Sequence, residues 1–179
     1  MKTIVASFAF ASLFAASALA DGPKADAPKA KPAKPVTVKL ADAKGKSIGT
    51  ATLSADPKGV KITLDVKGLE AGDHAIHVHE TAKCDAPDFK SAGGHFNPEH
   101  KKHGMDNAEG PHAGDMPNFT VDAKGASKAT VVAPNVTLDE GPHGVLAGTA
   151  LVIHAKADDM KTDPAGAAGD RIACGIIKK

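Results

Sequence analysis

The sequence predicts an all-β domain, a β-sandwich or barrel that carries two long loops. Apolar and polar residues alternate over several short segments, which is the period of a half-buried strand. Gly, Pro and Asp separate these segments, and no long stretch has the 3.6-residue period and the caps of a helix. With 179 residues, 42% of them hydrophobic, the chain is long enough to bury one core.

The first twenty residues predict an export signal and not a part of this domain. An apolar run that follows Lys2 ends at Ala18-Leu19-Ala20, the small-x-small pattern of a signal-peptidase site. A membrane anchor is the alternative, because about twenty residues can span a bilayer. The many Ala and Ser residues of the run argue against an anchor. We therefore expect cleavage after Ala20, a periplasmic location and no stable membrane insertion.

Residues 21–35 form a tract of Pro, Ala and Lys that has little apolar surface to bury. Such a composition predicts a flexible linker and leaves residues 36–179 as the single folded domain. The formal net charge of +1 and the absence of Trp and Tyr argue against a nucleic-acid partner.

The expected strands follow from alternation along this domain. Residues 36–40 and 48–53 alternate, and turn chemistry at 56–59 leads into a strand whose apolar residues occupy every second position from 60 to 66. Further strands are expected at 73–79, 118–122, 126–132, 145–155 and 171–177. Regions 80–116 and 156–170 are rich in Gly, Pro and charge. Loops of that length in a compact domain are usually functional or disordered.

Nine histidines against two cysteines are the most informative feature of the composition. His77 and His79 alternate with Val78, so both imidazoles project from one face of a strand. His154 ends an expected strand just before the second loop. Within the first loop lie four more potential ligands, His95, His103, His112 and Asp115. Imidazole suits copper and zinc, and zinc also accepts a carboxylate, so the set predicts a metal centre.

The remaining histidines have other expected roles. His74 shares the parity of Ile76 and Val78 and is expected to be a buried, hydrogen-bonded core residue. His100 and His143 have no special context and are interpreted as loop residues. A His-x-His pair alone is more often structural than a ligand, and it is the whole set that favours a metal.

Several strings in this domain resemble Cu,Zn superoxide dismutase of the exported bacterial type. The match runs in order through nearly all of residues 36–179. The strings are His77-Val78-His79-Glu80, Lys83-Cys84-Asp85-Ala86-Pro87, Gly94-His95-Phe96-Asn97-Pro98, Lys102-His103-Gly104, His112-Ala113-Gly114-Asp115, Val152-Ile153-His154 and Gly169-Asp170-Arg171-Ile172-Ala173-Cys174-Gly175. The resemblance implies a Greek-key β-sandwich or flattened barrel with a metal-binding loop and an electrostatic loop.

The resemblance also implies one copper ion and one zinc ion per subunit. The implied copper ligands are His77, His79, His95 and His154, and the implied zinc ligands are His95, His103, His112 and Asp115. His95 would bridge the two metals. Asp158 matches the carboxylate that connects the histidines of the two sides, although its spacing alone also fits a solvated loop charge.

The implied reaction converts two superoxide anions and protons to dioxygen and hydrogen peroxide by Cu(II)/Cu(I) cycling, as antioxidant defence in the cell envelope. Zinc would be structural and would tune the bridging His95, which would supply a proton. Arg171 would attract and orient the anion, its alternative being a surface salt bridge. Lys161 fits a steering role and a solvated loop position equally well.

Cys84 and Cys174 are the only cysteines, and an even count in an exported protein favours a disulfide. Two free buried thiols are the alternative. A bond that closes so long a segment contributes roughly 4 kcal/mol in the chain-entropy model.

Two other functions use parts of the same residue set. A non-catalytic copper-binding or copper-delivery protein would not need Arg171 or the bridge. A domain that binds only a structural zinc ion would leave His77, His79 and His154 without a role. Apolar faces lined by Val and Ala suit a monomer and a homodimer alike.

Overall fold

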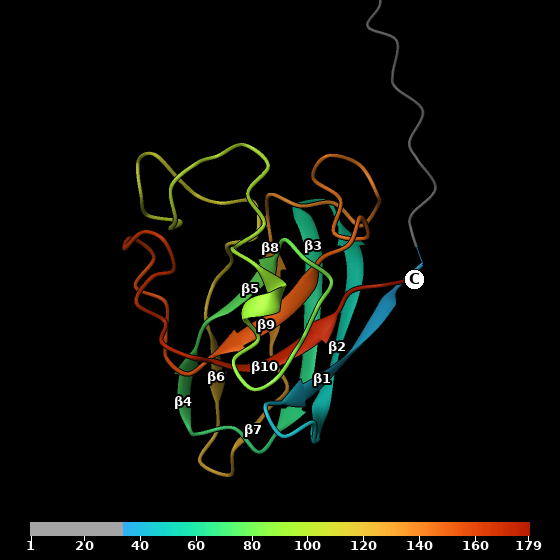
Figure 1. Cartoon of the computed structure of the whole chain (residues 1–179), viewed down its shortest axis with the longest axis vertical. Helices are drawn as coiled ribbons and strands as arrows, with labels where there is room; N and C mark the ends of the chain where they lie inside the picture. The colour runs from blue at the N-terminus through green and yellow to red at the C-terminus, as the bar shows by residue number, and fades with distance from the viewer. Residues whose placement is uncertain (1–33) are drawn as a thin grey trace, which may run out of the picture. The chain divides into compact units, whose positions relative to one another are not determined.

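The computed structural model of the protein describes residues 34–179 as an almost entirely β domain (Figure 1). The elements are β1 (Val36–Asp42), β2 (Ser47–Asp56), β3 (Gly59–Lys67), β4 (Gly72–His74), β5 (Ile76–His79), the 3-10 helix η1 (Lys90–Ala92), β6 (Phe119–Val121), β7 (Ala126–Ser127), β8 (Thr130–Ala133), β9 (Ala150–His154) and β10 (Arg171–Ile176). Within the described range, no helix is long and apolar enough to cross a membrane. The expected signal peptide, 1–20, and nearly all of the expected linker, 21–35, lie outside the described residues.

One curled antiparallel sheet forms the body of the domain (Figure 1). Its strands follow the order β5-β9-β10-β1-β2-β3-β7, β8 also pairs with β3, and β4 and β6 form a separate two-stranded sheet. The pairing of β10 with β1 joins the two ends of the domain, and the pairing of β5 with β9 brings two histidine-bearing strands together. The predicted all-β class, a sandwich or flattened barrel, is confirmed.

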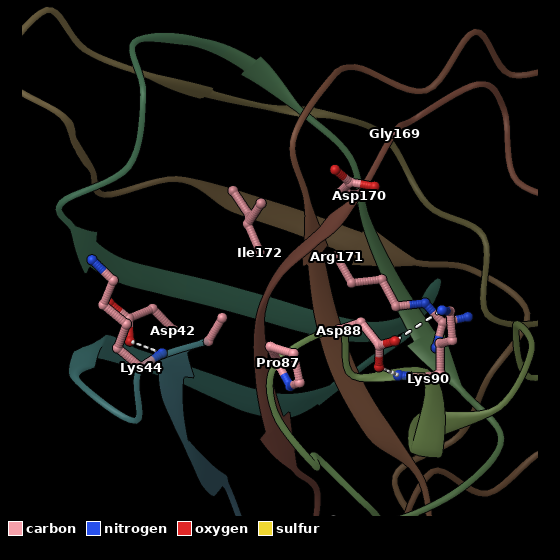
Figure 2. Close-up of a pocket in the computed structure, with 10 residues that line it drawn as sticks. Asp42, Lys44, Pro87, Asp88, Lys90, Gly169, Asp170, Arg171 and Ile172 are labelled. Atoms are coloured by element: carbon pink, nitrogen blue, oxygen red, sulfur yellow. Dashed lines mark hydrogen bonds and ion pairs between the residues drawn. The ribbon is translucent and has the colours of Figure 1, made fainter.

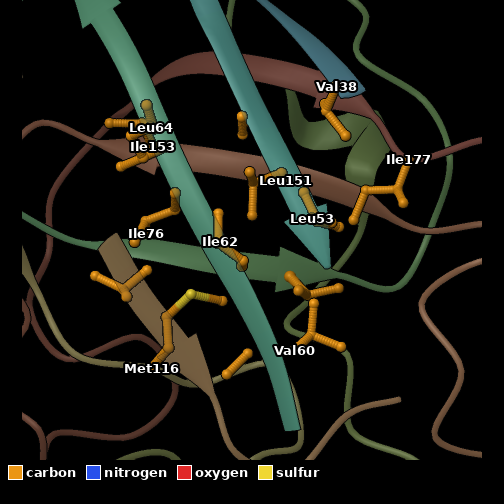
Figure 3. Packing of buried hydrophobic residues seen from close by; sticks show 14 of the residues in the cluster. Val38, Leu53, Val60, Ile62, Leu64, Ile76, Met116, Leu151, Ile153 and Ile177 are labelled. Atoms are coloured by element: carbon orange, nitrogen blue, oxygen red, sulfur yellow. The ribbon is translucent and has the colours of Figure 1, made fainter. Parts of the chain in front are cut away.

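Alternating burial explains why these segments are strands. Along β3 the apolar residues Val60, Ile62, Leu64 and Val66 are at most 2% exposed, while the residues between them are more exposed. Their side chains meet Leu151 and Ile153 from β9 in the interior (Figure 3). Burying each large aliphatic side chain contributes about 1.5–3 kcal/mol. β9 is buried along its whole length, so its last residue, His154, is attached to the core.

The expected strands were too long in three places. Segment 73–79 is two strands in different sheets, because the chain leaves the ladder at Ala75, whose N–H and C=O bond to Lys156 and His154. Segment 126–132 is likewise divided into β7 and β8. Only 150–154 of the expected strand 145–155 pairs in the sheet. Val145 is buried, but its carbonyl accepts from Thr149 in a turn.

Two expectations that do not concern strand limits are confirmed, the disulfide and the burial of His74. A disulfide joins Cys84 to Cys174, with Cα atoms 5.6 Å apart, and so ties the start of the first loop to β10. His74 is buried, with its ring nitrogens 2.8 and 2.9 Å from the carbonyl oxygens of His154 and Glu70. It therefore holds the backbone beneath His154.

Candidate metal centre

Two neighbouring strands and a returning loop bring the predicted ligands together. His77 and His79 lie on β5, His154 ends β9, and all three are buried. The first loop folds back onto β5, where the Phe96 N–H donates to the Val78 carbonyl at 2.8 Å. A Cβ at Gly114 would lie 2.2 Å from the same carbonyl oxygen, so only glycine permits this approach. The fold thus places His95 beside His79.

Four imidazoles form the first group, consisting of His77, His79, His95 and His154. One nitrogen from each lies within 4.8 Å of the others. The outward nitrogens have acceptors: His79 Nδ1 lies 3.0 Å from the Gly93 oxygen, and His154 Nδ1 lies 3.4 Å from the Gly169 oxygen. The inward Nε2 atoms of His79 and His154 are 3.4 Å apart.

Two inward nitrogens of this group lack hydrogen-bond partners among the described residues. They are His77 Nδ1 and His95 Nε2, both buried. An unsatisfied buried polar atom costs about 1–3 kcal/mol. A metal ion bound by the four rings would remove this cost, and an all-imidazole set suits copper.

The second group surrounds the buried carboxylate of Asp115. Its Oδ1 lies 2.9 Å from His95 Nδ1, 3.1 Å from His103 Nδ1 and 3.5 Å from His112 Nδ1. Its Oδ2 accepts the backbone N–H groups of Gly104 and His112, each at 2.9 Å. Three imidazole nitrogens and one carboxylate oxygen are a donor set that suits zinc. The set whose ligand atoms all lie within 4.8 Å of one another here is His77, His95, His103 and Asp115. The Nε2 of His77 is already held by Asp158, whereas the buried Nδ1 of His112 has no hydrogen-bond partner among the described residues.

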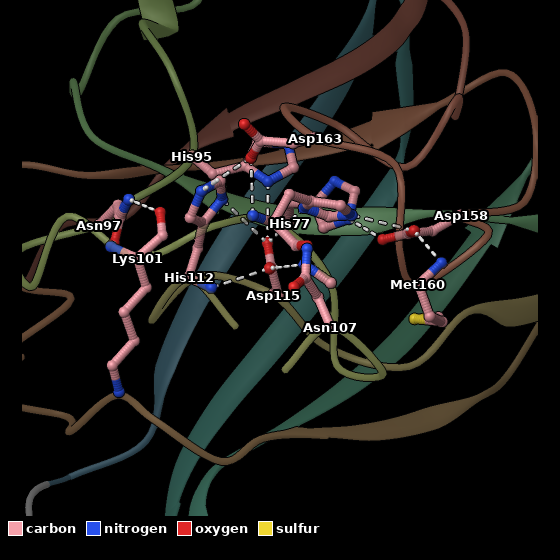
Figure 4. Close-up of polar contacts among 12 residues, drawn as sticks. His77, His95, Asn97, Lys101, Asn107, His112, Asp115, Asp158, Met160 and Asp163 are labelled. Carbon is pink, nitrogen blue, oxygen red and sulfur yellow. Dashed lines mark hydrogen bonds and ion pairs between the residues drawn. The ribbon is translucent and has the colours of Figure 1, made fainter. Parts of the chain in front are cut away.

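Two residues connect the groups. His95 belongs to both, because its Nδ1 faces Asp115 while its Nε2 faces the first group. Asp158 spans them from the other side, with Oδ2 2.8 Å from His77 Nε2 and Oδ1 3.0 Å from His103 Nε2 (Figure 4). Asp158 is buried, so it is not a solvated loop charge.

Burial and hydrogen bonding give the groups different protonation behaviour. Burial lowers the pKa of His95 and of His154 to about 4 and holds the pKa of His79 well below its usual range. Burial also opposes protonation of His103, but hydrogen bonds to Asp115 and Asp158 outweigh it and raise the pKa of His103 to about 9. The first group is therefore neutral near pH 7, the state in which imidazole binds a metal.

Arg171 stands at the entrance to the first group. It is the residue of β10 that pairs with His154, and its Nη1 and Nη2 donate to the carbonyls of Phe89 and Gly93 at 2.8 and 2.7 Å. A cleft of about 520 Å³ is lined by Arg171, His95 and His154, together with Glu80 and His100. The guanidinium therefore lines the same opening as the ligands.

A larger hollow of about 670 Å³ lies on another side of Arg171 (Figure 2). Acidic and basic side chains share its wall, and Lys90 forms an ion pair with Asp88 at 2.8 Å. No histidine lines it, although Arg171 and Gly169 line both openings. Lys161 lines neither opening.

Sequence reasoning missed three residues around the site. The Asn118 side chain accepts from the Asp158 N–H and donates to the Asp158 carbonyl, each at 2.9 Å. Asp163 accepts the His103 N–H at 2.8 Å. His100, interpreted as an ordinary loop residue, lines the cleft with a backbone φ of 53°. None lies at a spacing that indicates a ligand, because each contact depends on where the loops meet.

Known proteins with similar sequences and structures agree with this geometry. A sequence model described as copper/zinc superoxide dismutase matches residues 47–177. The chain is 53% identical over 143 residues to superoxide dismutase [Cu-Zn] 1 of Aquifex aeolicus, covering 78% of this chain and 85% of that protein. The structure of a SOD-like protein from Bacillus subtilis matches with a TM-score of 0.75 and 38% identity, over 79% of this chain and 97% of that chain. The Cu/Zn superoxide dismutase of Brucella abortus matches with a TM-score of 0.69 and 31% identity, over 81% and 100% of the two chains.

Proposed function

Because the chain belongs to the copper/zinc superoxide dismutase family, we propose how its own residues share the work of that enzyme. The protein is an oxidoreductase that converts two superoxide anions and two protons to dioxygen and hydrogen peroxide. Its metals are copper and zinc, of which copper supplies reversible one-electron chemistry while zinc supplies fixed positive charge without redox chemistry. The donor sets described above fit these two ions.

The copper-side group is His77, His79, His95 and His154, and the zinc-side group is His95, His103, His112 and Asp115. In our assignment the copper ligand atoms are His77 Nδ1 and the Nε2 atoms of the other three rings. The zinc ligand atoms are three Nδ1 atoms and Asp115 Oδ1. For His77, His79, His103 and His154 the choice of atoms rests on the other ring nitrogen, which Asp158 or a backbone carbonyl engages. For His95 and His112 it rests on Nδ1, which lies 2.9 and 3.5 Å from Asp115 Oδ1.

One observation carries the enzyme assignment. His95 directs Nδ1 to Asp115 at 2.9 Å, and its buried Nε2 has no hydrogen-bond partner among the described residues. A single ring that faces both donor sets can exchange a proton at Nε2 while Nδ1 stays fixed. We assign proton delivery to this atom, since the product needs protons in a site that contains few other donors.

Arg171 recognises the anion in this scheme. Carbonyl oxygens hold two of its N–H groups, so the planar guanidinium is oriented before superoxide arrives. A pre-organised charge at the cleft attracts the anion and loses little entropy on binding it.

The main alternative is a copper-binding or copper-delivery protein with the same fold. The similar protein from Bacillus subtilis is described only as SOD-like, and this description favours the alternative. The complete bridge and the oriented Arg171 favour turnover, because storage of copper needs neither. A domain that binds only zinc would leave the copper-side group without a purpose.

The expected site of action is the periplasm, where the enzyme would protect the cell envelope. The Cys84–Cys174 disulfide supports an oxidising compartment, and the sequences of 1–20 and 21–35 support export followed by a linker.

The deciding experiment measures metal content and superoxide consumption together in the exported protein loaded with copper and zinc. We expect His95→Ala to lower activity by roughly 100-fold or more. His143→Ala is the matched control, because the half-buried His143 side chain contacts only Asn135 and Glu99, both outside the ligand groups, and the variant should keep full activity. A parent protein that held both metals without turnover would support the delivery function instead.

A further inference from the structure

Each candidate ligand histidine has a second ring nitrogen that faces away from the proposed metal position. The acceptor of that nitrogen helps to orient the ring, and for one histidine the nearby carboxylate belongs to a residue that has no assigned role. Apart from His95, which faces both groups, four of the five rings have a near acceptor for this nitrogen. Asp158 is the acceptor for His77 and His103. Backbone carbonyls of Gly93 and Gly169 are the acceptors for His79 and His154. His112 is the exception. Asp163 Oδ1 lies 4.0 Å from its Nε2, within the range of an ion pair but beyond hydrogen-bond distance.

Asp163 also holds the other loop-borne zinc-side histidine. The same Oδ1 accepts the backbone N–H of His103 at 2.8 Å, and Oδ2 lies 3.5 Å from Lys102 Nζ. One carboxylate in the second loop therefore faces both His103 and His112, which the first loop supplies.

Contacts between the two loops hold the segment just before Asp163. The Asp106 N–H donates to the Met160 carbonyl at 3.0 Å, and Asn107 Nδ2 lies 3.3 Å from the Lys161 carbonyl. A Cβ at Gly104 would lie 2.2 Å from the Met160 oxygen, so the two loops touch backbone to backbone. Asp163 is itself exposed, with 40% of its side chain accessible, and these contacts hold the loop that carries it.

We propose that Asp163 is a positioning residue of the zinc site, which orients His112 through Nε2 and His103 through its backbone. This inference rests on the zinc ligands proposed above. Outer partners of metal-bound histidines fix the ring orientation and raise ligand basicity, and their loss typically costs roughly 10- to 100-fold in metal affinity. Asp163 would also make retention of zinc depend on the second loop.

The test compares zinc affinity, by chelator competition, in Asp163→Ala, Asp163→Asn and the parent protein. We expect Asp163→Ala to weaken zinc binding roughly 10- to 100-fold and Asp163→Asn to weaken it less, because the amide oxygen still accepts the His103 N–H. Cobalt(II) placed in the zinc site should show a changed visible spectrum in Asp163→Ala, since the His112 ring is released. Copper affinity should stay unchanged.

Asp159→Ala is the control, because Asp159 lies in the same loop and accepts only from Lys161 and Thr162. Equal losses in Asp159→Ala and Asp163→Ala, or unchanged zinc affinity in both Asp163 variants, would overturn the proposal. If Asp163→Ala does not fold, the affinity and cobalt spectrum of Asp163→Asn decide. His112→Ala is measured in parallel: full zinc affinity there would refute the proposed ligand set itself.

Discussion

The copper-side and zinc-side groups share His95 but are built in different ways. Three copper-side rings come from the buried strands β5 and β9, and the group contains no carboxylate. The zinc-side group lies on the first loop and surrounds Asp115, a buried anion. The hydrophobic core therefore places most of the copper-side group, whereas charge and hydrogen bonds place the zinc-side group.

This difference predicts how each group behaves without metal. Strands pinned by the core keep His77, His79 and His154 in place. The loop instead depends on Asp115 and Asp158, each of which bonds to more than one histidine. We expect the zinc side to be the part that a substitution or a pH change disorders first.

Removal of the central carboxylate should have the largest effect. Asp115→Ala removes one of the two carboxylate partners of His103, leaving only Asp158, and should destabilise the metal-free protein by about 3–5 kcal/mol, the usual cost of breaking a buried ion pair. Urea unfolding measures this loss. Asp88→Ala is the control, because the Asp88–Lys90 pair is exposed, and it should leave the midpoint unchanged. A small effect at Asp115 would mean that the loop is held by packing instead.

The two groups should give the metal-free protein opposite responses to pH. The pKa of His95 and His154 is lowered to about 4 in the fold, so the unfolded chain binds more protons below pH 6.5 and stability falls toward pH 4. The pKa of His103 is raised to about 9, so its contribution is complete below pH 6.5 and is lost as the pH rises through 9. We expect a stability maximum near pH 6.5, with a loss of about 2 kcal/mol for each of these two histidines between pH 6.5 and pH 4.5.

Urea unfolding between pH 4.5 and 9.5, with chelator present, measures both arms of this curve. His103→Gln should flatten the alkaline arm and leave the acid arm intact. Loss of the acid arm in that variant would show that the two groups do not titrate separately.

A change at Arg171 should affect activity without affecting the zinc side. Arg171→Lys keeps the positive charge but loses the planar guanidinium that bonds to Phe89 and Gly93, so we expect activity to fall roughly 10-fold. Zinc content and unfolding midpoint should match the parent, and Lys90→Ala in the neighbouring hollow should change neither. Loss of zinc from Arg171→Lys would mean that the arginine is a structural tie for both groups.

Residue type and alternation were sufficient to predict the strands of the body and the histidines of the centre. His77 and His79 stand in a clear alternating segment, and imidazole clusters have few other uses. Alternation could not show that Ala75 leaves the sheet or that Val145 is buried in a turn, because burial and strand pairing give the same apolar signal.

The partners outside the ligand sets could not be predicted. Asp163 meets His103 across 60 residues of chain, and Asn118 meets Asp158 across 40. Such contacts depend on how two irregular loops lie against each other, and no local period records that. The sequence shows which residues can bind a metal, while the tertiary structure decides which residues hold them.

One backbone atom links Arg171 to the copper-side group. The Gly93 carbonyl oxygen lies 2.7 Å from Arg171 Nη2 and 3.0 Å from His79 Nδ1. No substitution can delete a carbonyl oxygen, whereas one codon change can remove the links made by Asp158 or Asp163. Substitutions of Arg171 or His79 remove this link directly, but a variant that keeps both side chains keeps their shared acceptor.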